Sequence, residues 1–214
     1  MRNSPKIARG RFRMQTPRKL AICIPIATLV LLCSCVPVLS MRPFYTEKDQ
    51  TFDPRLLGTW FDPADKDSQG TITIERTAEN GHDAYSITLA DPSKKPVEKE
   101  AFEAHLFRLE GHLFLDVVQT KVYEGDDDML ILEVPAHMLG RVTFDGDVLN
   151  LTFLDDDWVK KNLENGNFSI RHESADDGTP LLTATTAELQ KFALDHVNDN
   201  DAFSVDVKNL HRKN

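Results

Sequence analysis

Short runs in which apolar and polar residues alternate occupy the chain from residue 71 to residue 153. Residues 71–75 and 85–89 alternate strictly, as strands with one buried face do. Apolar or alternating runs of similar length follow at 102–109, 113–118, 129–134, 141–144 and 149–153. This stretch therefore predicts a series of β-strands.

Turn signals separate several of these runs. Asn80-Gly81, Glu110-Gly111 and Asp145-Gly146 each stand between two adjacent strand-like segments, and glycine in that place favours a tight β-hairpin. The spacing leaves no room for the helical crossovers that parallel strands need. We therefore expect an antiparallel meander that forms a small barrel or a strongly curved sheet.

Helical patterns appear late in the chain. The acidic residues 155–157 precede 158–163, where negative charge suits the positive end of a short helix. Thr185 and Glu188 have the spacing of a capping box, and apolar residues then follow at helical intervals up to residue 197. Further strands are expected at 168–172 and 181–183. The predicted fold class is mainly β, with one or two short helices, one of them C-terminal.

The N-terminus resembles the leader of an exported bacterial protein. Residues 1–34 carry seven basic side chains and no acidic one, and residues 20–32 form an apolar run. The segment Leu32-Cys33-Ser34-Cys35 resembles the lipobox of bacterial lipoproteins, in which the last cysteine is acylated and becomes the first residue. Cys33 departs from the small or branched residue usual at its position. The resemblance implies lipid attachment at Cys35, and a start at Met14 gives the more ordinary leader length.

Two other interpretations of the leader stay open. An apolar run extended to about residue 39 is long enough for an uncleaved transmembrane anchor, with its basic end in the cytoplasm. Simple secretion, with cleavage elsewhere, is the third interpretation. Either form of anchoring places residues 42–214 on the extracytoplasmic side of a bacterial cell membrane or outer membrane. Beyond the leader, a tether is expected over 35–55, a single β-rich domain over 56–203 and a polar tail over 204–214.

Charge narrows the choice of partners. Beyond residue 34 the chain has 18 basic and 34 acidic side chains, a formal charge of −16. Such a surface repels phosphate backbones, so we expect no nucleic-acid partner. No cysteine follows Cys35, which excludes an internal disulfide or a thiolate metal site from the domain. We predict no cofactor.

The first strand-like segment carries a family resemblance. Leu57-Gly58-Thr59-Trp60 opens a β-rich chain and is similar to the G-x-W opening of lipocalins and related calycin barrels. The resemblance implies that Trp60 plugs one barrel end and that the interior holds an apolar ligand. The chain departs from that family in lacking a second lipocalin motif and in placing a helix among its late strands. The stretch 56–203 also resembles uncharacterised bacterial lipoproteins.

One segment approaches a calcium-binding loop. Asp65, Asp67 and Gly70 match positions one, three and six of an EF-hand loop. Arg76, however, stands at position twelve, where a glutamate is required, and Glu75 comes one residue early. We interpret the segment as a polar hairpin loop, in which Asp65, Asp67 and Glu75 are the best metal-ligating candidates that the sequence offers.

No catalytic residue is predicted. The chain has no Gly-x-Ser-x-Gly elbow, no P-loop and no dinucleotide fingerprint. Its histidines lack the i, i+4 spacing of a helix-borne zinc site. A nucleophile dispersed along the sequence is the one catalytic arrangement that such patterns leave open.

We therefore expect a membrane-anchored extracytoplasmic binding module, with an apolar small ligand or an envelope protein as its partner. The alternative is a structural or assembly protein of the cell envelope that acts through protein–protein contacts. The third hypothesis is a hydrolase with a dispersed site. An apolar cavity favours the first hypothesis and a filled barrel the second, whereas a cleft with a histidine in contact with a nucleophile favours the third.

Overall fold

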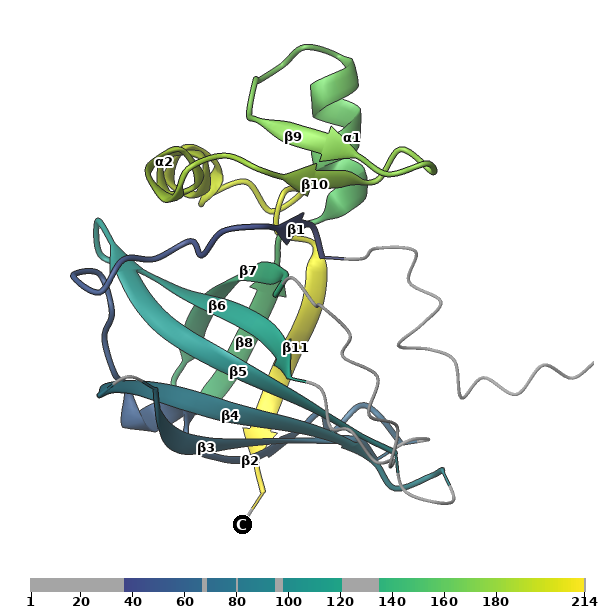
Figure 1. The fold of residues 1–214 in the computed structure, drawn as a ribbon. Helices are drawn as coiled ribbons and strands as arrows, with labels where there is room; N and C mark the ends of the chain where they lie inside the picture. Colours follow the sequence, from purple (N-terminus) through teal and green to yellow (C-terminus); the bar gives the residue numbers. More distant parts are fainter. Residues whose placement is uncertain (1–36, 67–68, 80, 95–97, 121–134, 214) are drawn as a thin grey trace, which may run out of the picture.

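The computed structural model describes residues 37–66, 69–79, 81–94, 98–120 and 135–213. A β-barrel and a smaller cap, which lies against the barrel wall, make up this part of the chain (Figure 1). The predicted leader, Cys35, Asp67 and the strand expected at 129–134 lie outside the described residues. Within the described ranges, no helix combines the length and apolar character needed to cross a membrane.

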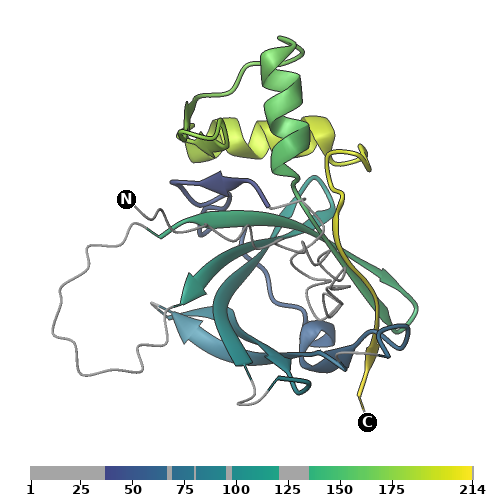
Figure 2. The ribbon, with the colours of Figure 1, turned by 90° about the vertical axis from the view of Figure 1, so that its right-hand side faces the viewer.

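Eight strands of the described residues close into an antiparallel barrel, which confirms the predicted fold class. In chain order they are β2 (Gly58–Phe61), β3 (Thr71–Glu79), β4 (His82–Asp91), β5 (Glu98–Leu109), β6 (His112–Thr120), β7 (His137–Asp145), β8 (Val148–Phe153) and β11 (Val205–Arg212). Each strand pairs with its neighbours in the chain, and β11 returns to pair with β2. The closed ring, seen end-on in Figure 2, leaves none of these strands at an open sheet edge.

The three expected hairpins are confirmed. Glu79 pairs with His82 across the first turn, Leu109 with His112 across the second, and Asp145 with Val148 across the third. In the second turn Glu110 has a φ of 47° and Gly111 a φ of 92°. Two successive residues with positive φ are what a two-residue hairpin with a type I′ turn requires.

The two barrel ends differ because connections in a meander alternate between them. One end, called the hairpin end, carries the turns of β3–β4, β5–β6 and β7–β8. The short 3₁₀ helix η1 (Pro54–Leu56) leads into β2 at that end. The other end, called the loop end, carries the connections β2–β3, β4–β5, β6–β7 and β8–β11.

The cap is inserted between β8 and β11. It consists of α1 (Asp156–Glu164), β9 (His172–Ser174), β10 (Pro180–Leu182) and α2 (Thr186–His196). The strand expected at 168–172 begins only at His172, and residues 168–171 have no regular structure. Both Figure 1 and Figure 2 show the cap beside the barrel wall.

Helix α2 begins where its capping box predicts, and α1 begins at Asp156, two residues before the expected start at 158. Asp155 is the N-cap of α1, and its side chain accepts the Trp158 N–H at 2.8 Å. Thr185 and Glu188 form a full capping box at the start of α2, which satisfies two backbone donors that a helix start otherwise leaves unpaired.

The segment expected to be a tether is part of the fold. β1 (Leu39–Ser40) lies between β7 and β10, antiparallel to the first and parallel to the second. Val38 and Phe44 are fully buried, so residues 37–55 join the cap to the barrel. The sequence pattern missed this role because the segment crosses several strands and shows no strand or helix period.

The segment expected to be a polar tail is β11, the strand that closes the barrel. Its register with β8 shifts between Val207 and Leu210, and Asn209 has a φ of 55°. This irregularity breaks the period-two pattern, although Leu210 is buried inside the barrel. An alternation rule therefore interprets 204–214 as polar coil.

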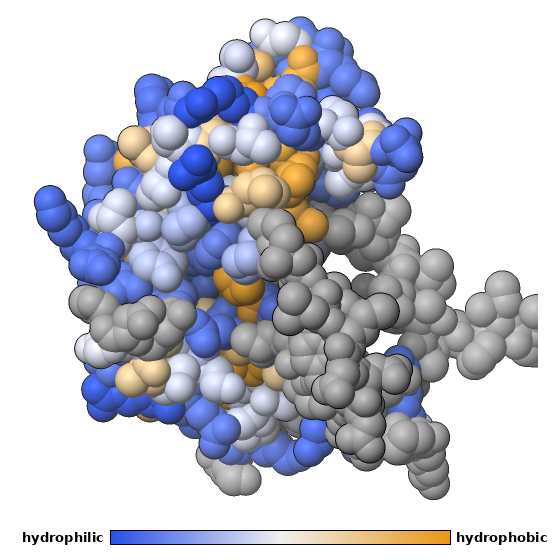
Figure 3. Space-filling view, in the orientation of Figure 1, coloured by the Kyte–Doolittle hydropathy of each residue, from blue (hydrophilic) through white to orange (hydrophobic). Residues whose placement is uncertain are grey.

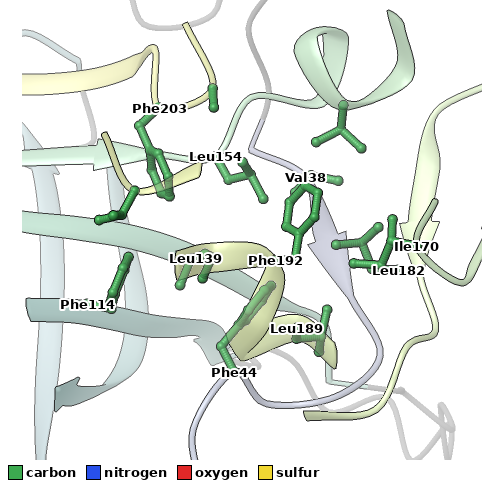
Figure 4. Packing of buried hydrophobic residues seen from close by; sticks show 14 of the residues in the cluster. Val38, Phe44, Phe114, Leu139, Leu154, Ile170, Leu182, Leu189, Phe192 and Phe203 are labelled. Carbon is green, nitrogen blue, oxygen red and sulfur yellow. The ribbon is translucent and has the colours of Figure 1, made fainter. Parts of the chain in front are cut away.

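Two hydrophobic clusters hold the molecule together. The barrel core contains Leu56, Trp60, Ile74, Tyr85, Ile87, Ala104, Leu106, Leu115, Val117, Val142, Leu149, Leu151 and Leu210, each at most 6% exposed. The second cluster joins the outer barrel wall to the cap and to the N-terminal segment. Phe114 and Leu139 of the wall, Phe44 of that segment and Phe192 of α2 meet there (Figure 4).

Strand β6 illustrates how one segment serves both clusters. Leu115 and Val117 face the barrel core, and Phe114, which precedes Leu115, faces the cap. Because both faces of the strand are covered, residues 113–118 form a nearly continuous apolar run instead of alternating. Asp116 is the one charged residue of this run, and it is fully buried.

Candidate functional site

A half-open hollow of about 290 Å³ lies on the cap, away from the barrel interior. One wall is the irregular segment 168–171, and the other is the outer part of α2. Its lining comprises Phe168, Ser169, Ile170, Arg171, Glu188, Lys191, Phe192, Asp195 and His196. We call this hollow the cap groove. Its volume lies close to the lower limit of about 300 Å³ for small-molecule sites.

Aromatic rings form the floor of the cap groove. The Phe168 and Phe192 rings are 5.0 Å apart between centroids and meet edge to face. The His196 ring lies 4.7 Å from Phe192 and 5.3 Å from Phe168. Trp158 of α1 stacks on Phe168 with the ring centroids 5.4 Å apart. These separations are those of favourable aromatic pairs, so the four rings hold one another in place.

Charged side chains form the rim. Arg171 Nη2 lies 2.6 Å from Glu188 Oε2, and Lys191 Nζ lies 2.5 Å from Asp195 Oδ2. The hydrogen bond from Arg171, together with those from Thr185, lowers the pKa of Glu188 to about 2. Each positive charge is thus matched by a negative one, and the groove carries no net attraction for an ion of either sign.

His196 supplies the polar group of the floor. Burial among the aromatic rings lowers its pKa below the usual 6.5, so the imidazole is neutral at pH 7. Its ring nitrogens have no hydrogen-bond partner among the described residues. A neutral imidazole has one donor and one acceptor nitrogen, which allows it to bind a polar atom on a ligand that stacks against Phe168 and Phe192.

Apolar side chains of the described strands point into the interior of the barrel. Its middle is filled by the barrel core, in which Leu106, Leu115 and Leu149 are each at most 1% exposed. Trp60 belongs to this core and is 1% exposed. Its indole N–H donates to the Leu56 carbonyl at 2.8 Å, and the guanidinium of Arg212 covers its ring at 4.5 Å. Trp60 therefore acts as a packed side chain of the barrel.

The metal-ligating candidates do not form a site in the described residues. Asp65 lies in the loop after β2, where its backbone N–H donates to Asp62. Glu75 is exposed on β3, and Asp67 lies outside the described residues. No group of three His, Cys, Asp or Glu side chains in the described ranges is placed to hold a metal ion.

A buried acid–histidine pair escaped the sequence-based search. Asp116 Oδ1 lies 2.7 Å from His137 Nδ1, and Asp116 Oδ2 accepts the Phe44 N–H at 2.7 Å. Ser40 is the register partner of His137, but its hydroxyl donates to the Arg42 carbonyl at 2.8 Å. Within the described ranges no nucleophilic side chain is hydrogen-bonded to this histidine, and Asp116 ties the N-terminal segment to β6 and β7. The sequence signal that could have predicted this pair is the single acidic residue, Asp116, within the apolar run 113–118.

Comparison with known proteins adds no relative. The chain matches no protein-family model, no curated protein and no solved structure. The fold itself defines the class: a closed up-and-down β-barrel whose last connection carries a helical cap.

Proposed function

We propose that this protein is a membrane-anchored extracytoplasmic binding module in which the barrel is the scaffold and the cap groove is the binding site. The observation that carries this proposal is the half-open aromatic hollow between 168–171 and α2. The middle of the barrel interior is packed with buried side chains, whereas the cap groove offers an apolar ligand partly exposed aromatic rings. A flat apolar or aromatic group with one polar atom fits the Phe168 and Phe192 rings and the neutral His196.

The position of β1 supports a lipid anchor over a transmembrane one. Val38 is fully buried in the domain, and Leu39 is paired in the sheet. These residues are therefore not free to extend a membrane helix to residue 39. The apolar stretch that remains, 20–36, has 17 residues, which is at the lower limit of about 17 for a transmembrane span. Acylation of Cys35 needs no span after cleavage of the leader.

A distant relation to calycins is part of the proposal. Supporting it are the closed eight-stranded meander and the place of Trp60, which packs beside η1 under Arg212. The insertion of the cap before β11 and the filled barrel middle separate this chain from the family pattern. The resemblance implies an apolar ligand inside the barrel, whereas we propose that the ligand binds in the cap groove.

The test uses indole as a probe and the full-length lipoprotein in detergent. Indole binding is measured by isothermal titration calorimetry, which reads the same signal in the wild type and in each variant. Replacing His196 by alanine removes one ring from the floor, and a lost aromatic contact of about 0.5–1.5 kcal/mol weakens binding roughly twofold to tenfold. His112→Ala is the matched control, because His112 is also partly buried but lies on β6. Equal indole affinity in wild type and His196→Ala would contradict the proposal.

The filled barrel favours a second candidate, an envelope assembly protein that acts through protein contacts. A photo-reactive residue at the exposed Ser169, in the groove wall, distinguishes the two functions in intact cells. A discrete protein adduct at Ser169, absent when the same residue replaces the exposed Asp147 on the β7–β8 turn, supports the assembly function. Adducts of small-molecule mass at Ser169 support the ligand-binding function.

A further inference from the structure

The chain enters the fold at the loop end of the barrel. Pro37 bridges to Asp155, just after β8, and the Val38 N–H donates to the Leu154 carbonyl at 2.9 Å. Leu39 pairs with Met138, the second residue of β7. The last residues of β8 and the first of β7 both belong to the loop end, so the N-terminal segment meets the barrel there.

Apolar side chains share one face around this point. Leu39 is the register partner of Met138 on one side and of Leu181 on the other. Partners on adjacent strands point to the same face, and Met138 packs against the barrel core. The inward face of the barrel therefore continues across β1 onto β10. All three side chains are partly exposed, and we call Leu39, Met138 and Leu181 the apolar shelf.

The surface over β1 and β10 is visibly more apolar than its surroundings (Figure 3). Met41, next to β1, is 40% exposed, the one large hydrophobic residue that is strongly exposed in the described ranges. Glu173 pairs with Leu181 from β9 and borders the shelf with a charge. Scattered apolar residues are ordinary on a protein surface, but a continuous patch beside the entering chain marks a contact region.

Chain length limits what can cover the shelf. Cys35 precedes Pro37 by two residues, which span at most about 7 Å when fully extended. We propose that the apolar shelf rests on the membrane surface, with the phospholipid interface as its partner. This inference depends on the proposed acylation of Cys35, because the acyl chains fix that residue at the bilayer. The acidic domain gains nothing from anionic lipids, so the contact is apolar and forms on neutral phosphatidylcholine.

The proposed orientation also places the two barrel ends at different distances from the membrane. Asp147, on the β7–β8 turn, lies at the hairpin end. Met138 and Asp145 are seven residue steps apart along β7, which at about 3.3 Å per step span roughly 23 Å. In the proposed orientation β7 runs away from the membrane, so Asp147 lies outside the headgroup layer.

Matched fluorophores at the two places test the inference. No cysteine follows Cys35, so Glu173→Cys and Asp147→Cys each give one labelling site in the acylated protein. Both positions are exposed acids, so neither change disturbs a core. The full lipoprotein is placed in phosphatidylcholine vesicles with brominated acyl chains, and we expect the label at 173 to be quenched several times more strongly than that at 147.

The possible outcomes distinguish a failure of the proposed membrane orientation from a failure of the proposed lipid anchor. Equal quenching at both sites, or stronger quenching at 147, overturns the orientation when the mass of the protein shows acylated Cys35. A wild-type mass without the acyl groups overturns the proposed anchor and the orientation together. Binding of indole to the cap groove is measured separately and is unaffected by either result.

Discussion

The guanidinium group of Arg212, near the end of β11, lies over the indole ring of Trp60 in β2, 4.5 Å from the ring centre. Its Nη2 donates to the Arg55 carbonyl at 2.8 Å, and its Nη1 donates to the Leu57 carbonyl. One side chain thus joins the last strand of the barrel to the first strand and to η1. It stabilises the β11–β2 pairing that closes the barrel, in which only two residues of each strand are paired.

Replacing Arg212 by alanine removes the contacts of its side chain with Trp60 and with the Arg55 and Leu57 carbonyls. The cation–π contact and the two charge-assisted hydrogen bonds are partly exposed to solvent, so we expect a loss of about 1–2 kcal/mol in the free energy of unfolding. Urea denaturation measures it. Lys213→Ala is the control, since it removes the same charge one residue later, and it is expected to change stability by less than about 0.5 kcal/mol. Equal effects of the two variants would assign the loss to charge alone.

Gly58 is constrained by the same arrangement. Its φ is +128°, and a Cβ atom built there would stand 2.6 Å from Arg212 Nη1. We expect Gly58→Ala to lower the free energy of unfolding by about 1–3 kcal/mol, chiefly through backbone strain. The double variant with Arg212→Ala separates strain from the steric clash. Additive losses in urea denaturation indicate strain alone, whereas a loss smaller than the sum indicates the clash.

Asp116 is expected to be the most sensitive acid in the described residues. Asp116→Ala leaves the Phe44 N–H and the His137 Nδ1 without their acceptor in a buried place. Such losses cost about 2–4 kcal/mol of unfolding free energy. The exposed Asp145, at the end of β7, is the matched control. A change of less than 1 kcal/mol at Asp116, measured by urea denaturation, would contradict the structural role assigned to the pair.

Glu188, on the rim of the cap groove, is expected to make the free energy of unfolding depend on pH in the acid range. Its pKa in the folded protein is about 2, against the usual 4.5. A lowered carboxyl pKa contributes stability above the unfolded value, and this contribution is lost as the pH falls from 4.5 through 2. NMR titration of the Glu188 carboxyl carbon is expected to give a midpoint near 2. In Arg171→Gln the midpoint should rise towards 4.5, and an unchanged midpoint would remove Arg171 as the main cause.

His196 is expected to titrate below 6.5, because burial disfavours its charged form. The unfolded chain then binds the proton more readily than the folded one, so stability falls as the pH drops through 6.5 towards the folded pKa. Phe168→Ala opens the floor to water and should raise the pKa of His196 towards 6.5. NMR titration of the ring protons compares the two proteins, and a lower pKa in the variant would contradict burial as the cause.

Local signals in the sequence determined several elements of the fold. The Asn80-Gly81, Glu110-Gly111 and Asp145-Gly146 turns and the Thr185–Glu188 capping box depend on neighbouring residues only, and each is found where the sequence places it. Turn and cap chemistry is satisfied within a few residues, which is why a single chain suffices to predict it.

Tertiary structure alone decided the rest. β1 is a strand because β7 and β10 supply partners 99 and 142 residues away from Leu39. In β11 the register shift interrupts the alternation of apolar and polar residues that would mark a strand in the sequence. The cap groove joins 168–171 to α2, and the Asp116–His137 pair joins two strands. These features depend on side chains and backbone groups that only the closed barrel brings together, so no short window of sequence contains them.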